Sequence, residues 1–313
     1  HVTRWSLLIG TTCVALVIAP IAFVGFGNPS LVAVGVGQAL YLIAASSLLA
    51  FREDRLVAWA LVPGLMVSLA QIAIGGVPRS VLVIAACGVV LGVVAAVHRV
   101  TAGTGERWRF SPGAVELSWA ATQALLGGVW ALMIGVGGWS LSPDPELVRR
   151  VGVAAAPVVL MMGFAEYRLV RWRRAVGKQL SAVDCPEEFA RQAARSFLLA
   201  LRAYAVVMLA ATATAVLLLR WIGRLEIADF RLLVSFGFLG CAMFSGLVLV
   251  AVGRPGLSLV MSAAALAATA TLVLLASSGL ADPTAAYALG CLVLAGVLTV
   301  ASVEHATQAV VYR

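Results

Sequence analysis

The sequence predicts an all-α polytopic membrane protein with ten transmembrane helices, and three observations lead to this prediction. Of the 313 residues, 62% are hydrophobic and only 12% are charged, whereas soluble domains carry about 25% charged residues. The apolar residues form ten separate runs, and a run of about 20 such residues spans a bilayer. The net charge of +8 comes from the polar stretches between the runs, which favours anionic lipid headgroups over nucleic acid as the partner.

The ten apolar segments are separated mostly by short polar loops. They cover residues 5–26, 31–51, 56–76, 80–98, 114–140, 150–167, 200–220, 231–252, 256–278 and 284–304. Ser111 before Pro112 predicts the start of the fifth helix, because a capping residue often precedes proline at the first helical position. Asp144 before Pro145 predicts the start of the sixth helix in the same way.

Residues 166–202 form the most basic stretch and hold eight of the 22 Lys and Arg residues. Such a stretch lies in water or among headgroups, and between membrane helices it marks the cytoplasmic face. Asp184 and Glu187 predict a capping box, in which Asp184 is the N-cap and Glu187 is the third helical residue. We therefore expect two helices here, the second running from about residue 185 into the seventh segment.

The distribution of cations predicts the orientation of the chain. With ten spans and a cytoplasmic N-terminus, 16 of the 22 Lys and Arg residues face the cytoplasm and six face the outside. The six are Arg79, Arg149, Arg150, Arg220, Arg224 and Arg231. Because cytoplasmic loops carry the excess of Lys and Arg, this split predicts that both termini are cytoplasmic.

Segments one to four look like segments seven to ten, which predicts a parallel pseudo-repeat. Both groups contain a short basic cytoplasmic turn, at 52–55 and 253–255, and both end near a histidine, His98 or His305. The offset of six helices is even, so both copies have the same orientation. The alternative is that helices rich in alanine and valine always look alike. Ten spans also suit small drug/metabolite transporters with two inverted five-helix halves, but the long basic stretch fits that class poorly.

Three stretches resemble the multidrug/oligosaccharidyl-lipid/polysaccharide (MOP) flippase superfamily. Residues 36–56 form a helix that ends in a basic cytoplasmic turn, and residues 253–266 begin with G-R-P-G and lead into a hairpin. Residues 154–175 form a helix with Pro157 in mid-span and a basic extension. Within the superfamily, this last stretch and the long helix after it are most similar to Pel-type exopolysaccharide exporters.

The resemblance implies twelve or more spans in two six-helix lobes. Residues 1–110 then form a four-helix part of the first lobe, and residues 111–313 form a six-helix second lobe with the basic cytoplasmic helical stretch 168–202. Two N-terminal helices of the family are lacking. Because the chain begins at His1 and not at a methionine, we expect the natural N-terminus to be longer.

One face of the fifth segment combines polar and aromatic residues, and we expect it to line a substrate cavity. Its members recur at helical spacing: Glu116, Trp119, Gln123, Gly127 and Trp130. Indole rings stack on sugars, and the carboxylate and amide bind hydroxyl groups. The alternative is interhelical packing with an interfacial Trp near each end of the span.

Charged residues at the end of the sixth segment are the second group of candidates. The resemblance implies that the fifth and sixth segments line a central cavity, where Glu166 and Arg168 would hold a phosphate or an acidic sugar. For Arg171, Arg173, Arg174 and Lys178 we expect binding to lipid headgroups or to a partner. Glu304 and His305 are candidates for proton coupling. The alternative is that they only mark the polar end of the last span.

Motifs for catalysis or metal binding are missing from the sequence. It contains no G-x-x-x-x-G-K-S/T loop, no H-E-x-x-H and no G-x-S-x-G, and its five cysteines are scattered singly. We therefore expect no cofactor, no metal and no enzymatic activity. The carboxylates expected on the outer side each lie beside a helix start or an arginine, so we expect them to cap helices: Asp144, Glu146, Glu226 and Asp229.

The leading hypothesis is a transporter or flippase that moves a lipid-linked or nascent polysaccharide across the inner, cytoplasmic membrane. Its expected partners are membrane lipids and a glycosyltransferase or another polysaccharide-synthesis subunit, without nucleic acid. The first alternative is a non-transporting membrane subunit that scaffolds an enzyme complex through its basic stretch. The second is an integral membrane glycosyl- or acyltransferase.

Overall fold

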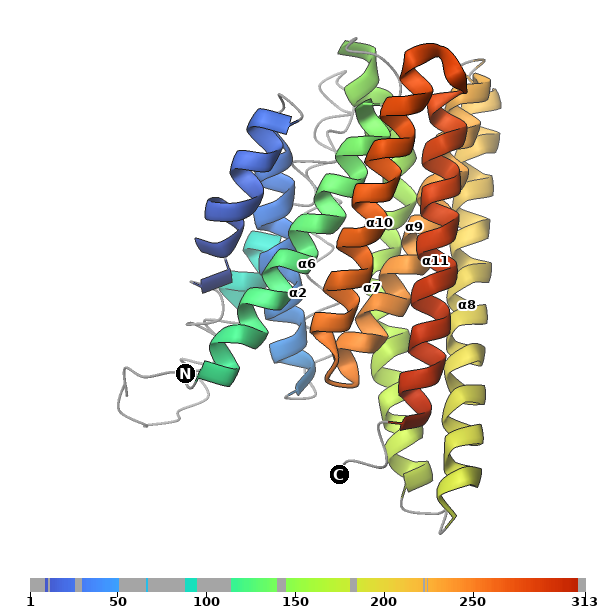
Figure 1. Cartoon of the computed structure of the whole chain (residues 1–313). Helices are drawn as coiled ribbons and strands as arrows, with labels where there is room; N and C mark the ends of the chain where they lie inside the picture. Colours follow the sequence, from blue (N-terminus) through green and yellow to red (C-terminus); the bar gives the residue numbers. More distant parts are fainter. Residues whose placement is uncertain are drawn as a thin grey trace. The chain divides into compact units, whose positions relative to one another are not determined.

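A computed structural model of the chain describes residues 9–10, 12–25, 30–50, 66, 88–94, 114–139, 145–180, 185–221, 223 and 225–308. Within these residues the protein is all-helical, without strands (Figure 1). Six of the described helices are long and apolar enough to cross a membrane. The protein is therefore of a membrane-embedded, all-α class.

The chain divides into two compact units, His1–Gly152 and Val153–Arg313, and each is described by itself. The first unit contains two short π-helical turns, η1 (Val14–Ile18) and η2 (Ile21–Gly25), and two long helices, α2 (Ser30–Ala50) and α6 (Ala114–Trp139). The helical residues 88–94 also belong to it. Helix α7 (Pro145–Leu180) begins in this unit and continues into the second.

Glycines allow the helices of the first unit to approach one another closely. A Cβ atom at Gly127 of α6 would lie 3.1 Å from the backbone nitrogen of Ala39 in α2. A Cβ atom at Gly88 would lie 2.9 Å from the Cα atom of Gly37 in α2. Small residues at such contacts let helix backbones pack directly, as is common within membranes.

The second unit is a bundle formed by most of α7 and by four further helices. These are α8 (Pro186–Trp221), α9 (Ile227–Ala251), α10 (Pro255–Leu275), extended by the π-helical turn η3 (Ala276–Leu280), and α11 (Pro283–Gln308). Proline is the first residue of α7, α8, α10 and α11, where its missing N–H costs no helical hydrogen bond. Gly253 and Gly279 have φ angles of 83° and 97°, which suit glycine in the turns before and after α10.

Helix α9 lies in the core of this unit, whereas α8 and α10 present apolar side chains outward. Helix α9 contacts α8, α10 and α11. In its apolar part 78% of the residues are buried, whereas only 17% are buried in the apolar part of α8 and 22% in that of α10. Leu209 and Leu217 of α8 and Val260 of α10 are at least 64% exposed. Exposed apolar faces of this length are typical of helices that contact lipid.

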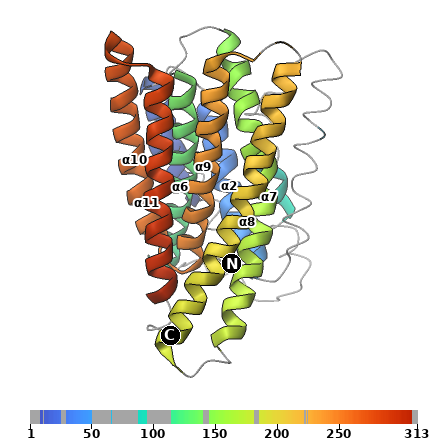
Figure 2. The ribbon, with the colours of Figure 1, turned by 90° about the vertical axis from the view of Figure 1, so that its right-hand side faces the viewer.

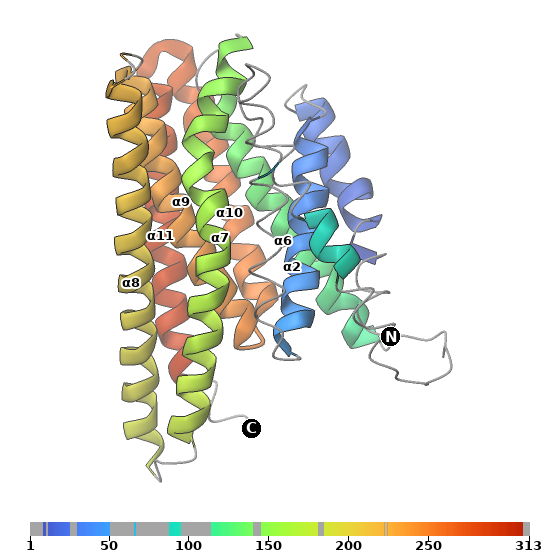
Figure 3. The same ribbon diagram turned by 180° about the vertical axis from the view of Figure 1, so that it is seen from behind.

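Helices α7 and α8 form a long antiparallel pair, which we call the α7–α8 hairpin. Their joined ends project beyond the ends of α9, α10 and α11 at the bottom of all three ribbon views (Figures 1, 2 and 3). In the sequence, basic residues follow the apolar portion of α7 and precede that of α8. The two helices expected for the basic stretch 166–202 are thus confirmed.

Seven of the ten predicted segments correspond to described helices: the second segment and the fifth to tenth. The sixth helix extends beyond its apolar segment at both ends, from Pro145 to Leu180, and it continues through the basic residues as expected. Helix α8 begins at Pro186, and the N–H of Phe189 donates to the carbonyl of Cys185 at 3.1 Å, one residue later than the expected capping box.

Other parts of the prediction fall outside the described residues. The third segment, except Met66, and most of the fourth lie there, as do the turns at 52–55 and 75–78, the loop 99–111, Pro112, Asp144 and Asp184. In the first segment, residues 12–25 are helical with two π-helical turns. The count of ten spans, the pseudo-repeat and the lobe boundary at residue 110 stay predictions.

Candidate functional site

The contact between α7 and α8 is made by side chains four residues apart on α7. Phe164, Arg168 and Trp172, which we call the α7 stripe, share one helical face because four residues make about one turn. Phe164 stacks on Tyr204 of α8 with ring centroids 6.4 Å apart. Trp172 meets Phe197 edge to face at 6.2 Å. The stripe therefore runs along the buried side of the hairpin.

The aromatic contacts continue from α8 into the core helix α9. Tyr204 stacks on Phe244 of α9 with ring centroids 4.8 Å apart and planes 11° apart. The hydroxyl of Tyr204 contacts the sulfur of Met208 at 3.9 Å. Gly240 of α9 makes room, since a Cβ atom there would lie 3.4 Å from that hydroxyl. The hairpin is thus anchored to the bundle by stacked rings.

Two nitrogen donors of the α7 stripe are buried without a hydrogen-bond partner among the described residues. They are Nε of Arg168 and Nε1 of Trp172. The side chain of Arg168 is half-buried, and its Nη2 donates to the carbonyl of Leu199 at a long 3.5 Å. Trp172 is only 5% exposed. Because both groups only donate hydrogen bonds, the partner that would complete them must be an acceptor.

Glu166 lies within the apolar span of α7, on a different face from Arg168 and Trp172. Its side chain is 3% exposed, and its Oε2 atom has no hydrogen-bond partner among the described residues. The guanidinium of Arg173, seven residues further along α7, is the charge that interacts with it. A buried carboxylate in a span is costly unless it serves a cavity or a partner.

The α7–α8 hairpin carries exposed cations on both helices, which we call the hairpin cations. They are Arg171, Arg173, Arg174 and Lys178 on α7, and Arg191, Arg195 and Arg202 on α8. Each helix arranges most of them along one side, since spacings of three, four and seven residues return to the same face. Together they give this end of the second unit a dense positive charge.

The polar-aromatic face of the fifth segment lies on α6, in the first unit. Gln123 and Trp130 are fully or almost fully buried, at 0% and 1% exposure, and Trp119 is half-buried. Gly127 packs against α2, so at this point the face contacts a helix, as the packing alternative expected. The side chain of Glu116 is not among those described.

The six cavity candidates are distributed over the two units. Trp119, Gln123 and Trp130, with the backbone of Glu116, belong to His1–Gly152, whereas Glu166 and Arg168 belong to Val153–Arg313. Of these residues, only Glu166 and Arg168 are placed in one structural unit with the hairpin cations. The cavity itself stays a prediction.

Two residues of functional interest were not predicted from the sequence. Trp172 was not among the candidate residues, because no spacing rule in the sequence singles out its indole nitrogen. Gln38 of α2 is 3% exposed, and its Nε2 has no hydrogen-bond partner among the described residues. A glutamine inside an apolar run is the sequence signal that would have identified it.

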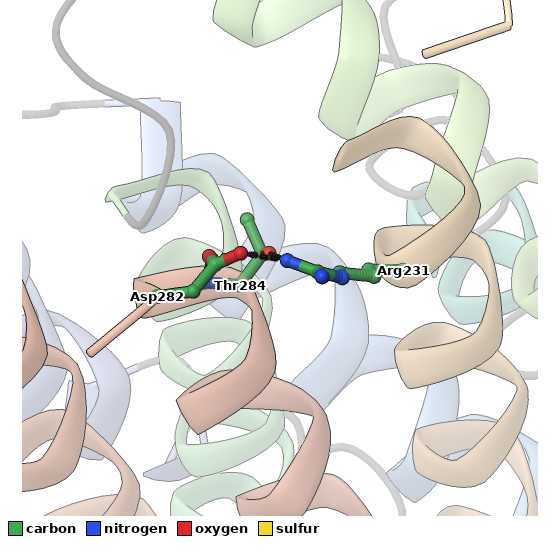
Figure 4. Close-up of polar contacts among 3 residues, drawn as sticks. All are labelled: Arg231, Asp282 and Thr284. Carbon is green, nitrogen blue, oxygen red and sulfur yellow. Dashed lines mark hydrogen bonds and ion pairs between the residues drawn. The ribbon is translucent and has the colours of Figure 1, made fainter. Parts of the chain in front are cut away.

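At the opposite end of the second unit, Arg231, Asp282 and Thr284 form a polar cluster (Figure 4). Arg231 pairs with Asp282 and lies 3.4 Å from the hydroxyl of Thr284. The predicted capping role is confirmed for Asp229, whose carboxylate accepts from the N–H of Glu226 at 3.0 Å. The side chain of Glu146 is not described, and Glu304 is exposed beside a half-buried His305 at the end of α11.

Within the described residues, no group of three or more His, Cys, Asp or Glu side chains is placed to hold a metal ion. Comparisons of the chain with protein-family models, with curated proteins and with solved structures gave no match. The class of the protein therefore rests on its helices and on the residues above: a membrane-embedded helical protein with a basic hairpin and a buried carboxylate.

Proposed function

We propose that this chain is a membrane transporter of the flippase type, which moves a lipid-linked or nascent polysaccharide across the cytoplasmic membrane. The observation that carries the proposal is the burial of Glu166 within the apolar span of α7. A buried ionisable group in an apolar span is costly unless function or a partner requires it. Transport pathways are the common setting for such groups in membrane proteins.

The positive end of the second unit supports an anionic substrate. Lipid-linked saccharides are carried on phosphate or diphosphate groups, and the hairpin cations would attract these groups to one membrane face. Glu166 and Arg168 lie on the same helix, directly before these cations in the sequence. A substrate arriving at the cationic face would therefore meet Arg168 first and the carboxylate deeper in the span.

The first unit supplies groups that suit the saccharide. Gln123 and Trp130 combine an amide and an indole on one face of α6, and Gln38 adds a second buried amide on α2. Amides exchange hydrogen bonds with hydroxyl groups, and indoles stack on the apolar faces of sugar rings. The resemblance to the MOP superfamily implies the same substrate class, an inner-membrane location and cytoplasmic termini.

A scaffold function is the second candidate, because the hairpin projects beyond the bundle (Figures 2 and 3). A helical pair of this kind reaches past the headgroups and offers charge to a soluble acidic enzyme. In that case the hairpin cations would be required for assembly of a complex, and Glu166 would be dispensable.

Deletion of the gene, followed by complementation with variants, tests transport against the alternatives. We expect deletion to abolish surface polysaccharide while its lipid-linked precursor accumulates, because synthesis continues without translocation. Glu166→Gln should reduce export at least tenfold at unchanged protein level, and Glu188→Gln, which alters an exposed carboxylate of α8, should complement fully. If the precursor disappears instead of accumulating, the protein acts in synthesis as a scaffold or a transferase. Unchanged surface polysaccharide after deletion would contradict the proposal.

A further inference from the structure

The α7 stripe contains two unsatisfied donors at the depth where α7 leaves its apolar span. Nε of Arg168 and Nε1 of Trp172 are buried without partners among the described residues, and their spacing of four residues places them one turn apart on one face. Buried donors are almost always hydrogen-bonded in native structures, because an unpaired donor loses its contact with water without replacement. Two such donors together indicate a missing acceptor.

The chemistry of the two donors restricts what that acceptor is. Neither group can accept a hydrogen bond, so a ligand that completes them must offer acceptor atoms. The guanidinium remains charged, and its planar fork matches the oxygens of phosphate or carboxylate. Nη2 of Arg168 is directed to the carbonyl of Leu199, which leaves Nε as the free donor of the fork. An anion with several acceptor oxygens fits both Arg168 and Trp172.

The position along α7 selects among the anions. The residues before Glu166 are almost entirely apolar, and Arg171, Arg173 and Arg174 follow directly after Arg168. The α7 stripe therefore lies where a bilayer has its headgroups, and phosphoryl groups are the anions concentrated there. The aromatic contacts of Phe164 and Trp172 with α8 hold the stripe in place, so the donors are fixed before a ligand arrives.

We propose that Arg168 and Trp172 form a phosphoryl-binding site at the root of the α7–α8 hairpin, occupied by the phosphate of a lipid headgroup or of a lipid-linked substrate. This site rests on the membrane placement in the proposed function and gives Arg168 a specific ligand class. Arg168 Nε and Trp172 Nε1 each donate to a phosphoryl oxygen. The site differs from the hairpin cations, because its donors are buried and those cations are exposed.

Binding to the purified full chain tests the site without any transport assay. The protein is held in a maltoside detergent, which contains no phosphoryl groups, and native mass spectrometry measures the dissociation constant of the first bound phosphatidylglycerol. Diacylglycerol, with similar tails and no phosphate, is the control probe. Inorganic pyrophosphate as a competitor distinguishes a soluble phosphate ligand from a lipid headgroup, and either source supports the site.

Conservative variants remove one donor at a time. Trp172→Phe deletes the indole N–H and keeps a ring against Phe197, and Arg168→Gln removes the guanidinium. Each variant should weaken phosphatidylglycerol binding about tenfold, as expected for a lost charge-assisted hydrogen bond. Matched controls are Trp221→Phe, at a residue 85% exposed, and Arg220→Gln, which removes an exposed charge of α8 that is not one of the hairpin cations. Both should change binding less than twofold.

Three results would overturn the site. The first is an unchanged dissociation constant in Trp172→Phe, and the second is an equal loss in Arg220→Gln, which would indicate general charge attraction. The third is diacylglycerol binding that equals phosphatidylglycerol binding and responds to the same variants. If Arg168→Gln unfolds, Trp172→Phe alone decides. If the variants lose phosphatidylglycerol binding and export normally, the site is retained and its part in transport is contradicted. If the wild-type protein binds phosphatidylglycerol and exports nothing, only the proposed function is contradicted.

Discussion

Asp282 caps helix α11 and at the same time forms an ion pair with Arg231, which lies one turn into α9 (Figure 4). Its carboxylate accepts from the backbone N–H of Thr284 at 2.8 Å and from the Thr284 hydroxyl at 2.7 Å. The side chains of Arg231 and Asp282 are 38% and 43% exposed. Asp282 therefore caps α11 and also takes part in an ion pair that solvent screens.

These two roles of Asp282 predict different costs. Asp282→Ala removes the cap and should lower the free energy of unfolding by about 1 kcal/mol. Arg231→Gln keeps the cap and removes the ion pair together with the long contact to the Thr284 hydroxyl. It should cost well under 1 kcal/mol, because exposed pairs contribute little after screening. Thermal unfolding in detergent compares the two variants. A larger loss in Arg231→Gln than in Asp282→Ala would contradict the capping role.

Close helix contacts predict that two glycines respond differently to alanine. At Gly88 the added Cβ would meet the backbone of Gly37, with a Cα atom at 2.9 Å, so Gly88→Ala should destabilise by about 1–3 kcal/mol. At Gly240 it would meet the sulfur of Met208 at 3.2 Å, and a methionine side chain can move aside.

Gly240→Ala should therefore be nearly neutral, since the gain in helix propensity of up to about 1 kcal/mol offsets the crowding. The melting temperatures of the two variants, measured side by side, provide the comparison. Equal destabilisation at Gly88 and Gly240 would show that backbone contact does not decide the cost.

The sequence pattern predicted the helices of the second unit well. Apolar runs located α9, α10 and α11 to within a few residues, because length and hydropathy alone identify a span. For α7 and α8 the basic stretch was expected to form two helices, the second from about residue 185, and the structure places their ends at Leu180 and Pro186. Arg and Lys are good helix formers, so both helices extend beyond the apolar runs.

The candidate site could be predicted only in part. Glu166 and Arg168 were identified because ionisable residues near a span are rare and costly. The role of Trp172 depends on which face of α7 meets α8, and the sequence alone does not show which helix α7 contacts. Gly127 was open to either a ligand or a close helix, and its contact with α2 needed three-dimensional packing to be seen.

The excess of cations on one side predicts the orientation of the hairpin. In a cysteine-free background, Lys178→Cys should react with a membrane-impermeant maleimide only after the cells are permeabilised. Ser278→Cys, in the exposed turn η3 at the opposite end of the bundle, should react in intact cells. The reverse pattern would place the hairpin outside and invert the topology.

The buried amide of Gln123 predicts a separation of transport from stability. Gln123→Leu replaces an amide at 0% exposure with a residue that is stable in helices and in lipid. If the amide serves a saccharide, export should fall at least tenfold while the melting temperature stays within a few degrees. Normal export at normal stability would exclude this face of α6 from the transport pathway, and a loss of stability alone would assign it to packing.

Reconstitution of the full chain in liposomes tests the proposed translocation most directly. The vesicles contain a fluorescent lipid-linked oligosaccharide, and an impermeant quencher added outside reports the fraction that reaches the outer leaflet over time. We predict that the wild-type chain makes the inner-leaflet pool accessible to the quencher, and that Glu166→Gln, folded and inserted to the same extent, slows this movement at least tenfold. Movement no faster than in protein-free liposomes, with the wild-type chain folded and inserted, would contradict a flippase function.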